Sequence, residues 1–118
     1  MTRQDPACIF CRIIRRELPA RVLFETDRSL AFEDVRPQAP VHILVIPKDH
    51  IASLNDTPAG SEKLLGELLM DARRAAREKG LAESGYRIVL NTGPGSGQAV
   101  FHIHFHVLGG RPLHWPPG

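Results

Sequence analysis

Three histidines alternate with apolar residues between Phe101 and Leu108, and no other stretch of the chain concentrates so much reactive chemistry. Successive side chains of a β-strand point to opposite faces, so His102, His104 and His106 are predicted to share one face. The other face is predicted to be buried and would carry Phe101, Ile103, Phe105 and Val107. Next-nearest strand positions lie roughly 7 Å apart, so neighbouring imidazoles can act on one small group. The spacing therefore predicts a functional site.

Two kinds of chemistry fit such a histidine face. Imidazoles at alternate strand positions can bind zinc, with a further ligand and a water completing a catalytic site. Alternatively, one histidine acts as a nucleophile. The loop Asn91–Ala99 precedes the histidines and has three glycines, which let backbone N–H groups approach a phosphate closely. This loop favours a phosphorus centre beside an imidazole.

Length and composition restrict the remaining possibilities. With 118 residues, the chain is expected to be one domain, 1–118, with a hydrophobic core. The net charge of +2 comes from scattered residues and does not indicate nucleic acid as a partner. Neither a signal peptide nor an apolar run long enough for a membrane span is seen. The two cysteines lie close together and suggest a reducing, cytoplasmic location.

Hydrophobic periodicity predicts an α+β fold. A short helix is expected over Cys8–Arg16, and one long helix that starts at Thr57-Pro58 and ends at Lys79-Gly80. The apolar stripe of the long helix consists of Leu64, Leu65, Leu68, Leu69, Ala72, Ala75 and Ala76. Strands are expected over Arg21–Glu25, Ser29–Asp34, Val41–Ile46, Tyr86–Asn91 and the histidine segment. Their short connections predict a five-stranded antiparallel sheet with one long and one short helix.

The segment His102–Leu108 resembles the signature of the histidine-triad family. Asp34–Lys48 and the ending Gly109–Gly118 resemble its nucleotide-binding branch, and the likeness runs from about Ile9 to Gly118. The resemblance implies a homodimer whose two sheets join into one. It also implies a purine nucleoside phosphoramidase or nucleotidyl hydrolase that releases a nucleoside monophosphate such as AMP and needs no cofactor for catalysis.

The resemblance assigns a role to each histidine. His104 would be the nucleophile, with its second nitrogen donating to the backbone carbonyl of His102, and would form a nucleotidyl-histidine that water hydrolyses. His106 would contact the phosphate oxygens and the leaving group, and His42 would support the histidine network. The expected nucleotide-binding residues, including Asp34 for the ribose and the backbone amides of Gly97 and Ala99 for the phosphate, are Ile9, Phe10, Ile13, Leu18, Phe32, Asp34, Val35, Leu44, Asn91, Gly97, Gln98 and Ala99.

Ala99 departs from the family pattern, because relatives often carry a serine there. That hydroxyl is thought to assist the leaving group. The reaction class is expected to survive, with lower efficiency on substrates whose leaving group is an amine.

Cys8-x-x-Cys11 allows three interpretations. It lacks the preceding strand of a typical redox pair. As half of a structural zinc site it needs two more ligands, and the resemblance supplies His50 and His102. The third interpretation is two buried cysteines without a ligand. In either of the last two cases the nucleophile is expected to stay free of metal.

The tail 109–118 contains Pro112, Pro116, Pro117 and the only tryptophan, Trp115. By resemblance the tail packs at the dimer interface, and Trp115 reaches the partner's active site. Three alternatives remain open: a nucleotide-binding adaptor with little turnover, a zinc hydrolase with the triad as ligands, and the family branch that cleaves dinucleoside polyphosphates, against which the Gly109–Gly118 ending argues.

Overall fold

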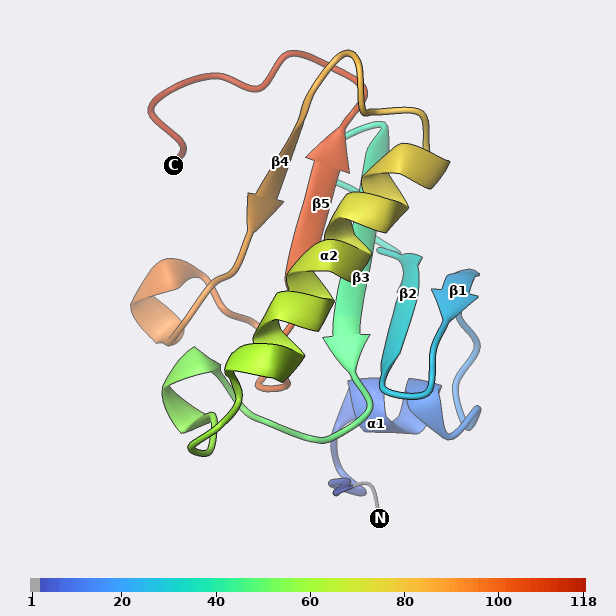
Figure 1. Ribbon diagram of the computed structural model, residues 1–118, viewed down its shortest axis with the longest axis vertical. Coiled ribbons are helices and arrows are strands. Elements are labelled where there is room, and N and C mark those ends of the chain that lie inside the picture. Colours follow the sequence, from blue (N-terminus) through green and yellow to red (C-terminus); the bar gives the residue numbers. More distant parts are fainter. Residues whose placement is uncertain (1–2) are drawn as a thin grey trace.

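A computed structural model describes residues 3–118 and shows one antiparallel five-stranded sheet with a helix on each face (Figure 1). The strand order is β1-β2-β3-β5-β4. The strands are β1 (Val22–Glu25), β2 (Ser29–Glu33), β3 (Val41–Pro47), β4 (Tyr86–Val89) and β5 (Phe105–Gly109), and the helices are α1 (Ile9–Ile14) and α2 (Glu62–Glu78). The predicted α+β class, with one long and one short helix, is confirmed. Within residues 3–118, no helix combines the length and the apolar character that crossing a bilayer requires.

Alternation along the central strand β3 divides the core in two. Ile43 and Val45 point toward α2 and pack with Leu68, Ala72 and other small or aliphatic side chains. Leu44 and Ile46 point the other way and pack with Phe10 of α1. His42 precedes Leu44 by two residues and therefore lies on the α1 face. The central strand β3 thus directs its histidine to the face of the sheet that carries α1.

The long helix begins later than the sequence predicted. Thr57 ends a short 3₁₀ turn, Leu54–Asp56, and Ser61 is the residue before the first helical turn. The chain between them turns at Gly60, whose φ of +86° lies in the left-handed region. The Thr57-Pro58 start was therefore wrong. Leu69 is 46% exposed and lies outside the buried stripe, which is formed by Leu68, Ala72, Ala75 and Ala76.

The histidine strand is also shorter than predicted. Regular pairing begins only at Phe105, opposite Val45 of β3. Before that point the chain leaves the sheet, and the amide of Ile103 donates to the carbonyl of Ile51 instead. Phe101 is consequently 48% exposed rather than buried. Strand β4 likewise ends at Val89, two residues before the predicted Asn91.

Candidate active site

Strand register brings His42 and His106 together. His106 of β5 pairs with Leu44 of β3, so His42 is its diagonal neighbour. Nε2 of His42 lies 2.8 Å from Nδ1 of His106. Asp34 follows β2, and its Oδ2 lies 3.5 Å from the same Nε2 of His42. The ring of His104, two residues before His106, lies 4.8 Å from the ring of His106, so three segments of the chain converge on the α1 face.

Hydrogen-bond partners fix which nitrogen of His42 carries a proton. The backbone N–H of Gln38 donates to Nδ1 of His42 at 3.0 Å, so this nitrogen must be the acceptor. Nε2 of neutral His42 then carries the proton and donates it to Nδ1 of His106. His106 in turn carries its own proton on Nε2. One backbone amide thus determines the tautomers of two imidazoles.

Nε2 of His106 is a buried polar atom that meets no hydrogen-bond partner within residues 3–118. Because a buried donor without a partner is costly, its presence indicates that a ligand completes the site. His106 lines the main pocket, so the acceptor for this N–H would enter there.

His104 is the opposite tautomer to His106, with its proton on Nδ1. Its Nδ1 lies 2.8 Å from the backbone carbonyl oxygen of His102 and donates to it. Nε2 of neutral His104 therefore carries the lone pair, and the ring borders the same pocket as His106. The predicted contact with the carbonyl of His102 is present. The pocket thus receives one imidazole lone pair and one imidazole N–H side by side.

Burial keeps these imidazoles neutral. Burial, together with smaller contributions from the neighbouring His104 and His42, lowers the pKa of His106 to about 4. The pKa of His104 also falls below its usual value because the ring is buried, although the carbonyl of His102 and Asp34 oppose the shift. The pKa of His42 is lowered for the same first reason. A neutral His104 is what nucleophilic attack requires.

The main pocket has a volume of about 840 Å³ and a largely apolar wall. Among the predicted nucleotide-binding residues, it is lined by Ile9, Phe10, Ile13, Leu18, Phe32, Asp34, Val35, Leu44, Gly97 and Ala99. The structure therefore brings most of the predicted set to one cavity with His42, His104 and His106. Val35 stands at its mouth and is 89% exposed.

Gln98 and Asn91 lie outside this lining. The buried side chain of Gln98 holds the glycine loop together: its Oε1 accepts from the amide of Gly93, and its Nε2 donates to the carbonyls of Ala52 and Val100. Asn91 lines a smaller cavity whose wall also includes His42 and His106. Sequence reasoning missed Gln38, because its contribution is a backbone amide that no residue type signals.

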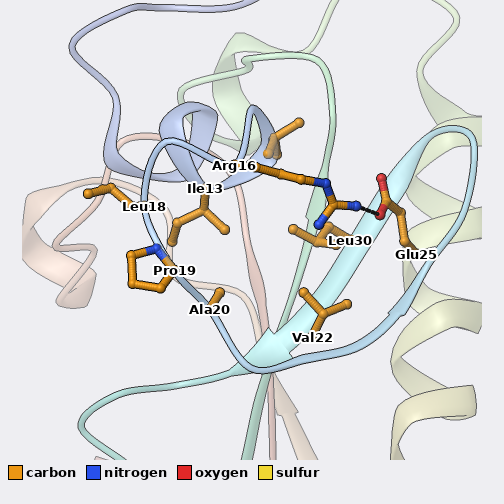
Figure 2. A pocket seen from close by; sticks show the side chains of 9 residues that line it. Ile13, Arg16, Leu18, Pro19, Ala20, Val22, Glu25 and Leu30 are labelled. Atoms are coloured by element: carbon orange, nitrogen blue, oxygen red, sulfur yellow. Dashed lines mark hydrogen bonds and ion pairs between the residues drawn. The ribbon is translucent and has the colours of Figure 1, made fainter.

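A second cavity, of about 200 Å³, lies beside α1 and is separate from the histidines (Figure 2). Ile13, Leu18 and Pro19 line both cavities. The ion pair between Arg16 and Glu25, with Nη2 and Oε1 2.8 Å apart, lies at its edge (Figure 2). With no imidazole in its wall, this cavity lacks the chemistry of the main pocket.

The side chain of His102 does not line the main pocket. Its side chain is fully buried, and its Nδ1 lies 3.4 Å from Sγ of Cys8, 3.6 Å from Sγ of Cys11 and 3.3 Å from Nδ1 of His50. We call Cys8, Cys11, His50 and His102 the cysteine–histidine cluster. Its four ligand atoms lie close enough to hold one metal ion. The triad itself does not gather three lone pairs, because Nδ1 of His104 donates to a carbonyl.

Comparisons with known proteins identify relatives of this chain. The family model described as HIT domain matches residues 15–113. The chain is 49% identical to the adenylylsulfatase HINT1 of Arabidopsis thaliana over 119 residues, covering 99% of this chain and 80% of the relative.

Two solved structures have the same fold. A HIT family hydrolase from Legionella pneumophila is 52% identical, with a TM-score of 0.91 and coverage of 94% of this chain and 99% of that one. A zinc-bound histidine triad family protein from Mycobacterium smegmatis is 40% identical, with a TM-score of 0.76 and coverage of 89% and 76%.

Proposed function

Because the chain belongs to the HIT domain family and resembles its hydrolases, we propose that it hydrolyses purine nucleoside phosphoramidates and related nucleotidyl substrates through a covalent intermediate on His104. One observation supports the proposal most strongly. The free lone pair of His104 and the unpartnered N–H of His106 face one pocket, with their rings 4.8 Å apart. A nucleophile and a donor for a phosphoryl oxygen stand together there.

In the proposed first step, Nε2 of His104 forms a bond to the α-phosphorus, and the bond from phosphorus to the leaving group breaks. An amine leaving group departs with a proton taken from solvent. His104 keeps its Nδ1 proton on the carbonyl of His102, so the attached imidazole is cationic and a good leaving group. Water then displaces it, and the nucleoside monophosphate is released.

The pocket walls suit a purine nucleotide. Aliphatic and aromatic side chains of α1 and β2, among them Phe10, Ile13 and Phe32, would contact the flat base. Asp34 lies at the end of β2 beside this wall, where its carboxylate would accept from the ribose hydroxyls. Gly97 has a φ of +93°, a conformation that favours glycine, and borders the pocket so that its amide would reach the phosphate.

Substrates with a weakly basic leaving group fit this chain especially well. Ala99 offers its backbone amide at the pocket wall but no hydroxyl to assist an amine. The Arabidopsis relative is named as an adenylylsulfatase. We therefore include adenylyl sulfate among the proposed substrates, because sulfate leaves without needing a proton.

The cysteine–histidine cluster would hold a structural zinc ion. In a tetrahedral site with Zn–S bonds of about 2.3 Å and Zn–N bonds of about 2.0 Å, neighbouring donor atoms are roughly 3.3 to 3.8 Å apart. The sulfur–nitrogen and nitrogen–nitrogen separations of 3.3 to 3.6 Å around Nδ1 of His102 match this spacing. The relative from Mycobacterium smegmatis is described as zinc-bound, which supports zinc as the ion. The ion would stabilise the fold, and no catalytic step is assigned to it.

A homodimer completes the proposal. Strand β4 pairs with β5 on one side only, so its outer edge offers backbone groups to a second copy of the chain. Trp115 in the tail is 81% exposed in the single chain, and we propose that it packs against the partner's active site. Light scattering should give the mass of two chains. The mass of one chain would contradict this part of the proposal.

Turnover is the direct test of the proposed function. Purified protein should convert adenosine 5′-phosphoramidate and adenylyl sulfate to AMP, and chromatography measures the AMP formed. The value of kcat/KM should persist below pH 6.5, because burial lowers the pKa of His104 and so keeps it neutral in mild acid. Protonation at lower pH removes the lone pair, and the rate should then fall.

Two results would contradict this account. An acid limb at or above pH 6.5 would show that the nucleophile is not the buried His104. Tight AMP binding without turnover of either substrate would favour the nucleotide-binding adaptor.

A further inference from the structure

His102 belongs to both networks of the site. Its side chain completes the cysteine–histidine cluster, and its backbone carbonyl accepts the proton of His104 Nδ1 at 2.8 Å. The other ring nitrogen, Nε2, donates to the carbonyl of Pro47 at 2.9 Å. Because that carbonyl can only accept, Nδ1 of neutral His102 carries a lone pair, and this lone pair is directed at the two sulfurs and His50.

A cation at the centre of the cysteine–histidine cluster would stabilise it. Nδ1 of His50 and Nδ1 of His102 lie 3.3 Å apart, and Nδ1 of His50 is also 3.4 Å from Sγ of Cys11. Two nitrogen lone pairs and two sulfurs at this spacing repel one another unless a proton or a metal ion lies among them. A tetrahedral divalent ion of the zinc type, bound by two sulfurs and two nitrogens, satisfies all four atoms at once.

A second connection runs through α1. This helix has only six residues, too few to be stable without anchoring. Cys8 is its N-cap and Cys11 lies in its first turn, so two of the four cluster residues fix its position. Phe10 lies between them, and its ring packs edge-on against the rings of His102 and His104, with centroids 5.8 Å and 5.2 Å away. Phe10 also lines the main pocket.

The cluster can be reached from solvent in the folded protein. A cavity of about 440 Å³ is lined by Cys8, Ile9, His50, Phe101 and other residues. This cavity gives a metal ion or a chelator a path to two of the four ligands, Cys8 and His50. Loading and removal would not need global unfolding.

We propose that metal loading of the cysteine–histidine cluster positions the nucleophile, with His102 acting on His104 through its carbonyl and Phe10 acting on it through α1. His102 and Phe10 are thus positioning residues, and the loaded cluster sets the activity of the enzyme as well as its stability. In its kinetic part, this inference rests on the proposed function.

The test compares the zinc-loaded protein with protein stripped by a chelator and then reloaded with Zn²⁺. Co²⁺ is used as a spectroscopic probe and should give the visible absorption of a tetrahedral site. The NMR signal of the hydrogen-bonded Nδ1 proton of His104 should shift or broaden when zinc is removed, and should return on reloading. In the same samples kcat should fall by about 10²-fold and recover, because small displacements of a reacting group cost rate of this order.

Variants separate positioning from general damage. Cys8→Ser weakens metal binding, yet serine preserves the N-cap of α1. His50→Gln removes one ligand that contacts neither His104 nor the main pocket. Both variants should show the altered His104 signal and the lower kcat, in proportion to zinc lost. Arg12→Ala changes an exposed residue of α1 and should leave zinc content, signal and kcat unchanged.

Three results would overturn the inference. The first is the absence of a tetrahedral Co²⁺ spectrum. The second is a stripped protein that loses thermal stability but keeps its His104 signal and kcat. If the stripped protein does not fold, the folded His50→Gln variant decides, and an unchanged signal and kcat at low zinc content would be the third. The NMR and metal measurements use no substrate, so their outcome is independent of whether phosphoramidates are turned over.

Discussion

Replacing His104 with alanine should lower kcat/KM for adenosine 5′-phosphoramidate by a factor on the order of 10⁴ or more, the scale seen when a covalent nucleophile is removed. The loss follows from the structure because, among residues 3–118, His104 alone presents an imidazole lone pair to the main pocket, while Nε2 of His106 carries a proton. Steady-state kinetics with AMP detection measure the effect.

The control for His104→Ala is nucleotide binding. The apolar wall and Asp34 remain in the variant, so AMP affinity by calorimetry should change little. A second variant, His104→Gly, leaves room for free imidazole, which should restore part of the rate. If His104→Ala retains more than a tenth of wild-type activity, His104 is not the nucleophile.

Replacing His106 with alanine should lower kcat by about 10² to 10³-fold, because a preorganised donor to the developing phosphoryl charge is lost. His42 acts on the phosphate through His106, since its Nε2–H donates to Nδ1 of that ring. His42→Ala should therefore cost less, on the order of tenfold, by freeing His106 to adopt the other tautomer. Both rates come from the same assay.

The double variant tests whether the two rings act as one unit. His42→Ala combined with His106→Ala should be no slower than His106→Ala alone, because the relay has no effect once its end is removed. If the rate losses of the two single variants multiply in the double variant, His42 contributes independently of His106. The proposal that His42 acts by fixing the tautomer of His106 would then be refuted. Melting temperatures of the three variants identify any loss caused by unfolding.

Local patterns predicted much of the fold and part of the site. The alternation around Val41–Ile46 and the helical stripe around Leu68 are local signals, and both elements formed. The histidine pattern predicted one face for His102, His104 and His106, whereas the structure brings His104 and His106 together and directs the His102 side chain to Cys8 and Cys11. Their distinct proton states could not be read from spacing, because they depend on a backbone amide at Gln38 and on a carbonyl at His102.

The failures have a common physical origin. Phe101 was expected to be buried because alternation was extended over the whole segment, whereas β3 pairs with β5 only from Phe105 onward. Where a strand joins the sheet depends on long-range contacts, such as the one between Ile103 and Ile51. For the same reason, spacing alone left the ligands of Cys8 and Cys11 open, and folding brought His50 and His102 to them.

The measurement that tests the central claim most directly is intact-protein mass spectrometry after rapid quenching. Wild-type protein is mixed with excess adenosine 5′-phosphoramidate and quenched within the first turnovers. The account predicts a species heavier by one adenylyl group, with the modification located on His104 by fragmentation. Turnover without such a species at any quench time, or an adduct on another residue, would contradict covalent catalysis by His104.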